Sequence, residues 1–169
     1  MLKVGDIAPS FCAANQDDVE ICSRDLAGKW IVLYFYPKDL TPGCTTEACD
    51  FTDKHSFFDD LDAVVLGCSA DDTDKHRKFI DKYDLTITLL SDVSKKMCED
   101  YGVWQLKKFM GKEFMGVIRS TFIINPEGEI AAIWDKVSVR KTKSVKGEKI
   151  EILHVDEVRS KLQELQSKN

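Results

Sequence analysis

The sequence predicts an α/β domain in which helices flank a central mixed β-sheet. Three observations predict it: apolar runs of strand length alternate with segments of helical periodicity, the last two strand-like runs flank a tight turn, and no Pro-, Gly- or Ser-rich linker interrupts the 169 residues. Buried runs separated by helices indicate parallel strands, whereas a hairpin adds antiparallel ones. A chain of this length can bury about 70% of its unfolded surface, so we expect one domain over residues 1–169.

The first predicted elements are a hairpin, a buried strand and a helix. Cys12 and Cys22 flank a polar turn at residues 15–18, which predicts an N-terminal β-hairpin extension with the two thiols facing each other. Residues 29–36 are continuously apolar, β-branched and aromatic, as is typical of a strand buried on both faces. Residues 44–58 then show helical spacing, which predicts one helix after the buried strand.

The rest of the chain continues the alternation and ends in a hairpin and a helix. The predicted elements are a strand at 63–68, a helix at 72–83, a strand at 87–90, a helix at 94–101, strands at 119–125 and 129–134 around a Pro-Glu-Gly turn, and a last helix capped by Asp156 with Val158, Leu162 and Leu165 inside. These elements complete the mixed sheet.

Composition and charge exclude several classes of function. The net charge is −5, whereas nucleic-acid-binding domains usually carry a basic balance, so we expect no nucleic-acid partner. No apolar run approaches the roughly 20 residues that a membrane-spanning helix needs, and residues 1–6 lack the apolar core of a signal peptide. We therefore expect a cytoplasmic protein without a membrane partner.

The chain has six cysteines, and without an export signal we expect reduced thiols with one or two reactive members. Cys68 ends an apolar run and Cys98 lies in a helical segment, so both are interpreted as buried and inert. A Cys12–Cys22 disulfide is the less favoured alternative, because strand pairing alone does not provide the required Cβ geometry.

Cys44 occupies the most informative position. It follows the Pro42-Gly43 turn and precedes a predicted helix, and Cys49 comes five residues later. The start of a helix presents free backbone N–H groups and the positive end of the helix dipole, which favour a thiolate over a thiol. A cysteine nucleophile needs that environment, and the second thiol indicates a redox cycle rather than hydrolysis.

At these residues the chain resembles the peroxiredoxins, and within them the bacterioferritin-comigratory-protein, or peroxiredoxin Q, branch. The pattern Pro-x-x-x-Thr-x-x-Cys followed by a distant Arg-Ser-Thr-Phe is specific, and the resemblance covers nearly the whole chain. The matching segments are residues 4–11, 34–37, 41–45, 89–92, 101–104, 109–112 and 118–122.

The resemblance implies a thioredoxin-like fold and a thiol peroxidase that reduces hydrogen peroxide and organic hydroperoxides. Cys44 matches the peroxidatic cysteine, while Thr41, Arg119 and Pro37 match the other active-site positions. Arg119 is suited to hold thiolate and peroxide with fixed N–H donors. The Thr41 hydroxyl is suited to accept from the peroxide while donating to sulfur, and Pro37 to shield the thiolate from water.

Cys49 matches the resolving cysteine of this branch, which implies an intramolecular Cys44–Cys49 disulfide and reduction by thioredoxin or a similar dithiol. On one helix, residues five apart are separated by about 140° and about 7.5 Å, so their Cα atoms lie about 8–9 Å apart. A disulfide tolerates about 7 Å at most, so the first turn must unwind. We expect no cofactor and no metal, and a monomer, because the chemistry closes within one chain.

Three other classes of function stay open. A thiol–disulfide exchange protein without peroxidase activity is disfavoured by the Cys-x-x-x-x-Cys spacing, which is not Cys-x-x-Cys. A redox-sensing interaction protein would use the same thiols to switch binding. A metal site formed by Cys44, Cys49 and His55 lacks familiar zinc spacing.

Several residues have two interpretations. Glu47 is either a first-turn carboxylate that complements the helix dipole or a residue that orients Arg119, and we slightly prefer the first interpretation. Trp104 and Phe109 are interpreted as packing residues near the site, and His55 and His76 as ordinary helix residues. The basic stretch 136–149 is either a solvated loop or long hairpin, or a docking surface for an acidic partner.

Overall fold

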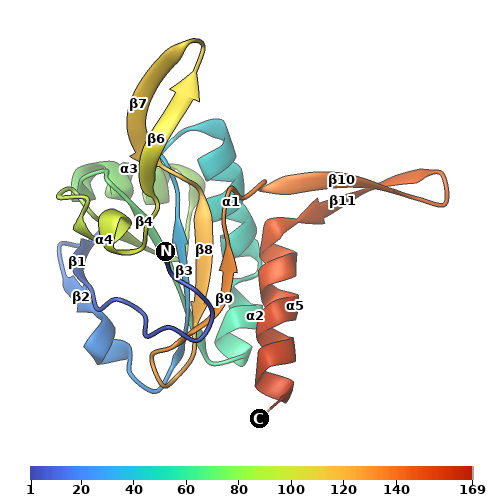
Figure 1. Cartoon of the computed structure of the whole chain (residues 1–169), viewed down its shortest axis with the longest axis horizontal. Helices are drawn as coiled ribbons and strands as arrows, with labels where there is room; N and C mark the ends of the chain where they lie inside the picture. Colours follow the sequence, from blue (N-terminus) through green and yellow to red (C-terminus); the bar gives the residue numbers. More distant parts are fainter. Residues whose placement is uncertain (169) are drawn as a thin grey trace.

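A seven-stranded mixed sheet forms the centre of the protein in the computed structural model, which describes residues 1–168 (Figure 1). The strand order is β2-β1-β5-β4-β3-β8-β9, with β3, β4 and β5 parallel and the other neighbours antiparallel. The strands are β1 (Cys12–Asn15), β2 (Glu20–Cys22), β3 (Trp30–Phe35), β4 (Ala63–Ser69), β5 (Thr88–Ser91), β8 (Ser120–Ile124) and β9 (Ile130–Trp134). The mixed sheet and the N-terminal hairpin confirm the predicted architecture.

The central strand β3 is buried along its whole length because it contributes to both faces of the sheet. Val32 and Tyr34 point into one apolar cluster, whereas Leu33 and Phe35 point into the other. Alternate residues of a strand face opposite sides, so a strand covered on both sides must be apolar throughout. This is the physical basis of the continuous apolar run in the sequence.

Helices cover the two faces unequally. The helices are α1 (Pro42–Asp53), α2 (His55–Asp60), α3 (Thr73–Tyr83), α4 (Lys96–Asp100) and α5 (His154–Ser167), and a 3-10 turn η1 spans Ser23–Leu26. Residues of α1, α2, α3 and α5 enter the cluster around Tyr34, whereas α4 enters the other. Within the described chain, no helix is long and apolar enough to cross a membrane.

Two helix predictions need correction. The single helix expected over 44–58 is divided at Lys54 into α1 and α2, although Phe51 and Phe58 still share one buried cluster. The last helix begins at His154 rather than at a cap on Asp156, because β11 runs directly into it. Asp156 lies in the first turn, where its charge complements the helix dipole.

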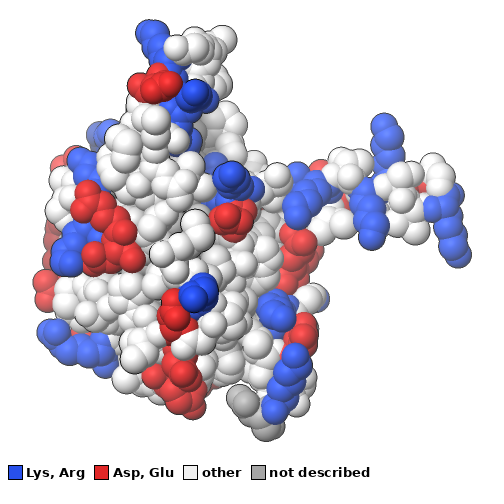
Figure 2. All heavy atoms as spheres, in the orientation of Figure 1, with Lys and Arg blue, Asp and Glu red and all other residues white. Residues whose placement is uncertain are grey.

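Two further hairpins project from the body of the protein (Figure 1). The first, β6 (Trp104–Phe109) with β7 (Lys112–Val117), was not predicted, and Phe109 is 66% exposed rather than packed. The second, β10 (Arg140–Val145) with β11 (Glu148–Leu153), resolves the basic stretch into a long hairpin, here called the basic arm. Figure 2 shows Lys and Arg side chains along this arm.

The N-terminal hairpin carries a disulfide. Cys12 and Cys22 are paired directly across β1 and β2, and their sulfur atoms are 2.07 Å apart. The preference for reduced thiols is therefore wrong for this pair. Cys44, Cys49, Cys68 and Cys98 are free thiols, and Cys68 and Cys98 are fully buried, as expected for inert cysteines.

Candidate active site

Cys44 lies where β3 ends and α1 begins. The strand runs into a loop over residues 37–41, and Thr41 then occupies the N-cap position of α1 with Pro42 in the first turn. Proline is favoured there because its missing N–H has no partner in a helix start and its φ already suits the helix. Cys44 is the third residue of α1 and only 2% exposed, so its sulfur lies inside the protein at the positive end of the helix.

Arg119 holds the Cys44 sulfur. Its Nη2 donates to Cys44 Sγ at 3.3 Å, and its Nη1 donates to Glu47 Oε1 at 2.8 Å. Arg119 directly precedes β8, whose first residue, Ser120, pairs with Phe35 at the end of β3. The β3–β8 pairing therefore brings a distant arginine to the same sheet end as the cysteine.

Glu47 orients Arg119 and is fully buried. The slightly preferred interpretation of Glu47 as a dipole-complementing carboxylate is therefore wrong, since the side chain turns inward to the guanidinium. Burial raises the pKa of Glu47 to about 7, even though the charge and hydrogen bond of Arg119 act in the opposite direction. Gly43 makes room for the guanidinium, because a Cβ there would lie 3.2 Å from Arg119 Nη2.

Thr41 and Pro37 belong to the loop beside Cys44. The Thr41 hydroxyl donates to the carbonyl of Lys38 at 2.7 Å, so in this conformation it does not donate to sulfur, contrary to the expectation from the sequence. Its lone pairs stay available to accept a hydrogen bond. Pro37 is half-buried at the start of the loop and has no N–H to offer.

A buried polar network supports this loop, and sequence reasoning missed it. Asp39 accepts from the Tyr36 hydroxyl at 2.5 Å and contacts His76 Nδ1 at 2.5 Å, while its backbone N–H donates to Asp71 at 2.8 Å. His76 is fully buried, so it is not an ordinary helix residue. Its place three residues before the buried Phe79, on the inner face of α3, was the available signal.

Cys49 lies on the same helix as Cys44, as the unwinding argument requires. It is half-buried, and burial together with the charges of Asp53 and Asp50 raises the pKa of its thiol. Asp50, the next residue, is 2% exposed and accepts two hydrogen bonds from Arg140 of the basic arm. Arg140 Nη2 donates to Asp50 Oδ1 at 2.7 Å, and Nε donates to Oδ2 at 3.2 Å. The arm is thus tied to the helix that carries both thiols.

The metal site considered from the sequence does not assemble. Among residues 1–168, only Cys12, Glu20 and Cys22 bring three potential ligand atoms close together, and two of these residues form the disulfide. His55 instead shares a 2.7 Å hydrogen bond with the Thr86 hydroxyl.

A mixed sheet with a buried, arginine-held cysteine at the start of a helix defines a thiol-dependent oxidoreductase. The family model described as the AhpC/TSA family matches residues 4–133. The chain belongs to this family, and it is a peroxiredoxin of the Bcp, or peroxiredoxin Q, branch.

Relatives of known name support that placement. Peroxiredoxin Bcp of Bacillus subtilis is 49% identical over 139 residues, which cover 82% of this chain and 88% of that protein. Peroxiredoxin Bcp of Escherichia coli is 42% identical over 134 residues, covering 79% and 86%. The family match ends before the basic arm and α5.

Solved structures confirm the thioredoxin-like fold. The bacterioferritin comigratory protein of Xanthomonas campestris superposes with a TM-score of 0.79 at 35% identity, covering 92% of this chain and 91% of that one. A mutant of PrxQ from Xylella fastidiosa superposes with a TM-score of 0.83 at 30% identity and covers 98% of both chains. The peroxiredoxin assignment therefore rests on sequence and structure together.

Proposed function

We propose that this peroxiredoxin reduces hydrogen peroxide and organic hydroperoxides at Cys44, closes a Cys44–Cys49 disulfide, and is recycled by thioredoxin or a similar dithiol. The observation that carries the proposal is the 3.3 Å hydrogen bond from Arg119 Nη2 to Cys44 Sγ at a helix start. The bacterioferritin comigratory protein of Xanthomonas campestris has alkyl peroxide reduction activity, which favours organic hydroperoxides among the substrates of this chain.

The first step is an in-line displacement at oxygen. The Cys44 thiolate attacks one peroxide oxygen, the O–O bond breaks, and the second oxygen leaves with the electron pair and takes a proton. Arg119 stabilises the charge passing to the leaving oxygen with N–H donors that cannot lose their proton at working pH. The free lone pairs of Thr41 accept from the peroxide, and the product on Cys44 is a sulfenic acid.

The second step joins the two thiols of α1. Cys49 sulfur attacks Cys44 sulfur, the S–O bond breaks, and hydroxide leaves as water with the proton of the Cys49 thiol. The Cα atoms of residues five apart on an intact helix lie about 8–9 Å apart, beyond the about 7 Å that a disulfide spans. The first turn of α1 therefore unwinds in every cycle.

The start of α1 is built to open. Thr41 stands at the N-cap, but its hydroxyl bonds Lys38 and provides no capping bond, which weakens a helix by about 1 kcal/mol. Gly43 in the first turn also disfavours the helix, because glycine loses more backbone freedom than alanine when it is ordered. Unwinding also exposes Cys49 and so removes the burial that raises its pKa, which makes its thiolate easier to form.

The remaining assignments follow from the same chemistry. An intramolecular disulfide needs no second subunit, so we assign a monomer in which residues 1–169 work as one domain, without metal or cofactor. We place it in the cytoplasm, where thioredoxin-type dithiols supply the electrons. The alternative of thiol–disulfide exchange without peroxidase activity would not require the Arg119 contact.

Stopped-flow oxidation of the reduced protein by hydrogen peroxide tests the proposal. We expect a fast phase that disappears in Cys44→Ser. In Cys49→Ser we expect one burst of oxidation but no turnover with thioredoxin, because the sulfenic acid has no resolving partner. Cys98→Ala serves as control, since it removes a buried thiol outside α1.

Two results would contradict it. A fast phase that persists in Cys44→Ser would move the peroxidatic role to another cysteine. Normal turnover in Cys49→Ser would remove Cys49 from the resolving role and leave the first step intact.

A further inference from the structure

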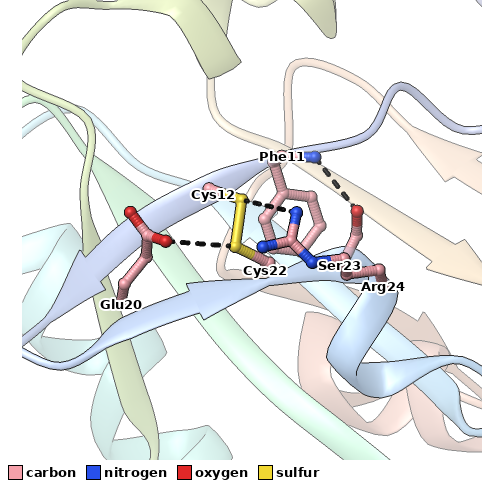
Figure 3. Close-up of a disulfide and its surroundings, with 6 residues drawn as sticks. All are labelled: Phe11, Cys12, Glu20, Cys22, Ser23 and Arg24. Carbon is pink, nitrogen blue, oxygen red and sulfur yellow. Dashed lines mark hydrogen bonds between the residues drawn. A yellow bond between two sulfur atoms is a disulfide. The ribbon is translucent and has the colours of Figure 1, made fainter.

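The disulfide between Cys12 and Cys22 lies at the edge of the sheet (Figure 3), whereas Cys44 and Cys49 lie on α1. It joins β1 to the edge strand β2, and β2 pairs with no other strand of the described sheet. Neither sulfur takes part in the chemistry proposed for Cys44 and Cys49. The environment of this bond shows whether it is a structural link or a reactive one.

One of its two cysteines is open to solvent. Cys12 is exposed, whereas Cys22 is 2% exposed. A groove of about 510 Å³ runs beside the bond and is lined by both cysteines, Arg24, Ser94 and Lys96 among others. A structural disulfide is normally enclosed and resists exchange, whereas an accessible one is labile.

Both sulfur atoms already have partners for the reduced state. Arg24 Nη1 lies 3.9 Å from Cys12 Sγ, and Glu20 Oε1 lies 3.5 Å from Cys22 Sγ (Figure 3). A guanidinium stabilises a thiolate, and a carboxylate accepts a hydrogen bond from a thiol. A disulfide sulfur carries no hydrogen, so the Glu20 contact becomes a hydrogen bond only after reduction.

Hydrogen bonds hold the hairpin in addition to the disulfide. Asn15 Oδ1 accepts from the N–H groups of Asp17 at 2.9 Å and Val19 at 3.0 Å, which closes the turn. At the other end, Phe11 and Ser23 exchange two hydrogen bonds of 2.9 and 3.1 Å. Because β1 is also paired to β5, we expect the hairpin to keep its place when the S–S bond is broken.

We propose that Cys12–Cys22 is a second redox centre, which accepts electrons from dithiols independently of Cys44. A thiolate of the dithiol attacks the exposed Cys12 sulfur and forms a mixed disulfide, and the bond between Cys12 and Cys22 breaks. The Cys22 sulfur leaves with the electron pair of that bond, takes a proton from solvent and donates a hydrogen bond to Glu20.

The second thiol of the dithiol completes the exchange. This thiol attacks the dithiol's first sulfur, which is bonded to Cys12 in the mixed disulfide, and releases Cys12 as a thiolate beside Arg24. The dithiol departs as a disulfide, oxidised by two electrons. Of the two protons that it loses, one is balanced by the proton taken up at Cys22 and the other passes to solvent, because Cys12 is released as a thiolate. Arg24 favours this second release because it stabilises the leaving thiolate.

Site-resolved alkylation of the oxidised full-length chain tests the proposal. The protein is incubated either with dithiothreitol or with thioredoxin, thioredoxin reductase and NADPH, and the peptides holding Cys12 and Cys22 are quantified by mass spectrometry. We expect both cysteines to become alkylated with unchanged far-UV circular dichroism, and equally in Cys44→Ser. Success with dithiothreitol alone would assign small dithiols as partners, and success with both reagents would include protein dithiols.

Retention of the disulfide in both reagents until urea is added would overturn the proposal and make the bond structural. A second set of variants tests whether Arg24 promotes the reduction. Arg24→Met is expected to slow reduction several-fold, Arg24→Lys to restore it, and Lys29→Met to leave it unchanged. Equal rates in all three would overturn the role of Arg24. The alkylation measurement is repeated in Cys44→Ser, so its result can be interpreted even if the peroxidase mechanism proposed for Cys44 is wrong.

Discussion

At the scale of single residues, Arg119 and Glu47 set the electrostatics around Cys44. The Glu47 carboxylate accepts a hydrogen bond from one guanidinium nitrogen of Arg119, and the Cys44 sulfur accepts one from the other. The orientation of Arg119 therefore depends on both residues. Glu47 Oε2 has no hydrogen-bond partner among the described residues. An unsatisfied buried oxygen disfavours the ionised carboxyl, which agrees with a pKa raised to about 7 by burial.

This raised pKa predicts a pH-dependent stability. A carboxyl whose folded pKa of about 7 lies above its unfolded value of 4.5 stabilises the fold most below pH 4.5, and this contribution is lost as pH rises through 7. Relative to Glu47→Gln, we expect the free energy of unfolding of the wild-type protein to fall by up to about 3 kcal/mol between pH 4.5 and 7.5. Urea denaturation of the reduced proteins at both pH values measures this.

Glu148→Gln is the control, because it neutralises an exposed carboxylate on the basic arm. It is expected to follow the wild-type curve. A constant difference between wild type and Glu47→Gln across this pH range would show that Glu47 ionises without cost in the folded protein.

At the scale of elements, α1 must open at one end and stay in place at the other. The ring of Phe51 stacks on Tyr34 of β3 at a centroid distance of 4.6 Å, and Asp50 is held by Arg140. Both anchors lie after Cys49, whereas the first turn lacks a side-chain cap. The helix is therefore expected to unwind from its N-terminal end toward Cys49.

The Arg140–Asp50 pair is expected to limit how readily α1 unwinds. Arg140→Met leaves the buried Asp50 carboxylate unpaired, which destabilises this part of the helix. We expect faster amide exchange over residues 44–50 in the reduced protein and faster closure of the Cys44–Cys49 disulfide after oxidation. The bimolecular rate with peroxide is expected to stay the same, because Arg140 contacts neither Cys44 nor Arg119 in the described structure.

Hydrogen–deuterium exchange and quenched-flow trapping of the disulfide measure these two quantities. Lys143→Met is the matched control, since it removes a cation from the same strand that forms no ion pair within residues 1–168. Identical behaviour of the Arg140→Met and Lys143→Met proteins would mean that the arm does not restrain the helix. If the amide-exchange protection of residues 44–50 did not change on oxidation, the proposed unwinding of α1 would be wrong.

At the scale of the whole molecule, His154 connects the end of the basic arm to the central sheet. Its Nε2 shares a 2.8 Å hydrogen bond with the Thr121 hydroxyl, and its ring packs edge-on against Trp134 at 5.5 Å. Burial, followed by the charges of Lys141 and Arg119, lowers its pKa to about 4. The imidazole is therefore neutral at working pH.

A lowered histidine pKa predicts the opposite pH dependence from that of Glu47. The stability that neutral His154 contributes is fully present above its unfolded value of 6.5 and is lost as pH falls through 4. Relative to His154→Gln, we expect wild-type unfolding free energy to drop by up to about 3 kcal/mol between pH 7 and pH 4. Denaturant titrations at these pH values measure it, with His55→Gln as the half-buried control.

If the unfolding free energies of wild type and His154→Gln changed in parallel with pH, His154 would be able to carry a positive charge in the folded protein. Glu157 is the only acidic side chain within ion-pair distance of its ring among the described residues, with Oε1 3.9 Å from Nδ1. This single contact would then have to compensate the positive charges of Lys141 and Arg119.

Local patterns in the sequence were sufficient for much of the architecture. The buried strand 29–36, a helix beginning near Cys44 and the β8–β9 pair were all predictable, because the period of apolar residues records which positions are buried. The β6–β7 hairpin was not predictable in this way. Its exposed residues include Leu106, Phe109 and Met115, so apolar character there does not mark a core.

The sequence by itself determined the alternation of strands and helices in the central sheet and the position of Cys44 at a helix start, and motif resemblance assigned Arg119 to the same site. Only the tertiary structure decided the contacts that join Glu47 to Arg119 and Asp50 to Arg140, which are 72 and 90 residues apart. The same holds for the choice between thiols and a disulfide at Cys12 and Cys22. Periodicity reports the burial of each segment, but contacts between distant segments depend on how the sheet aligns them.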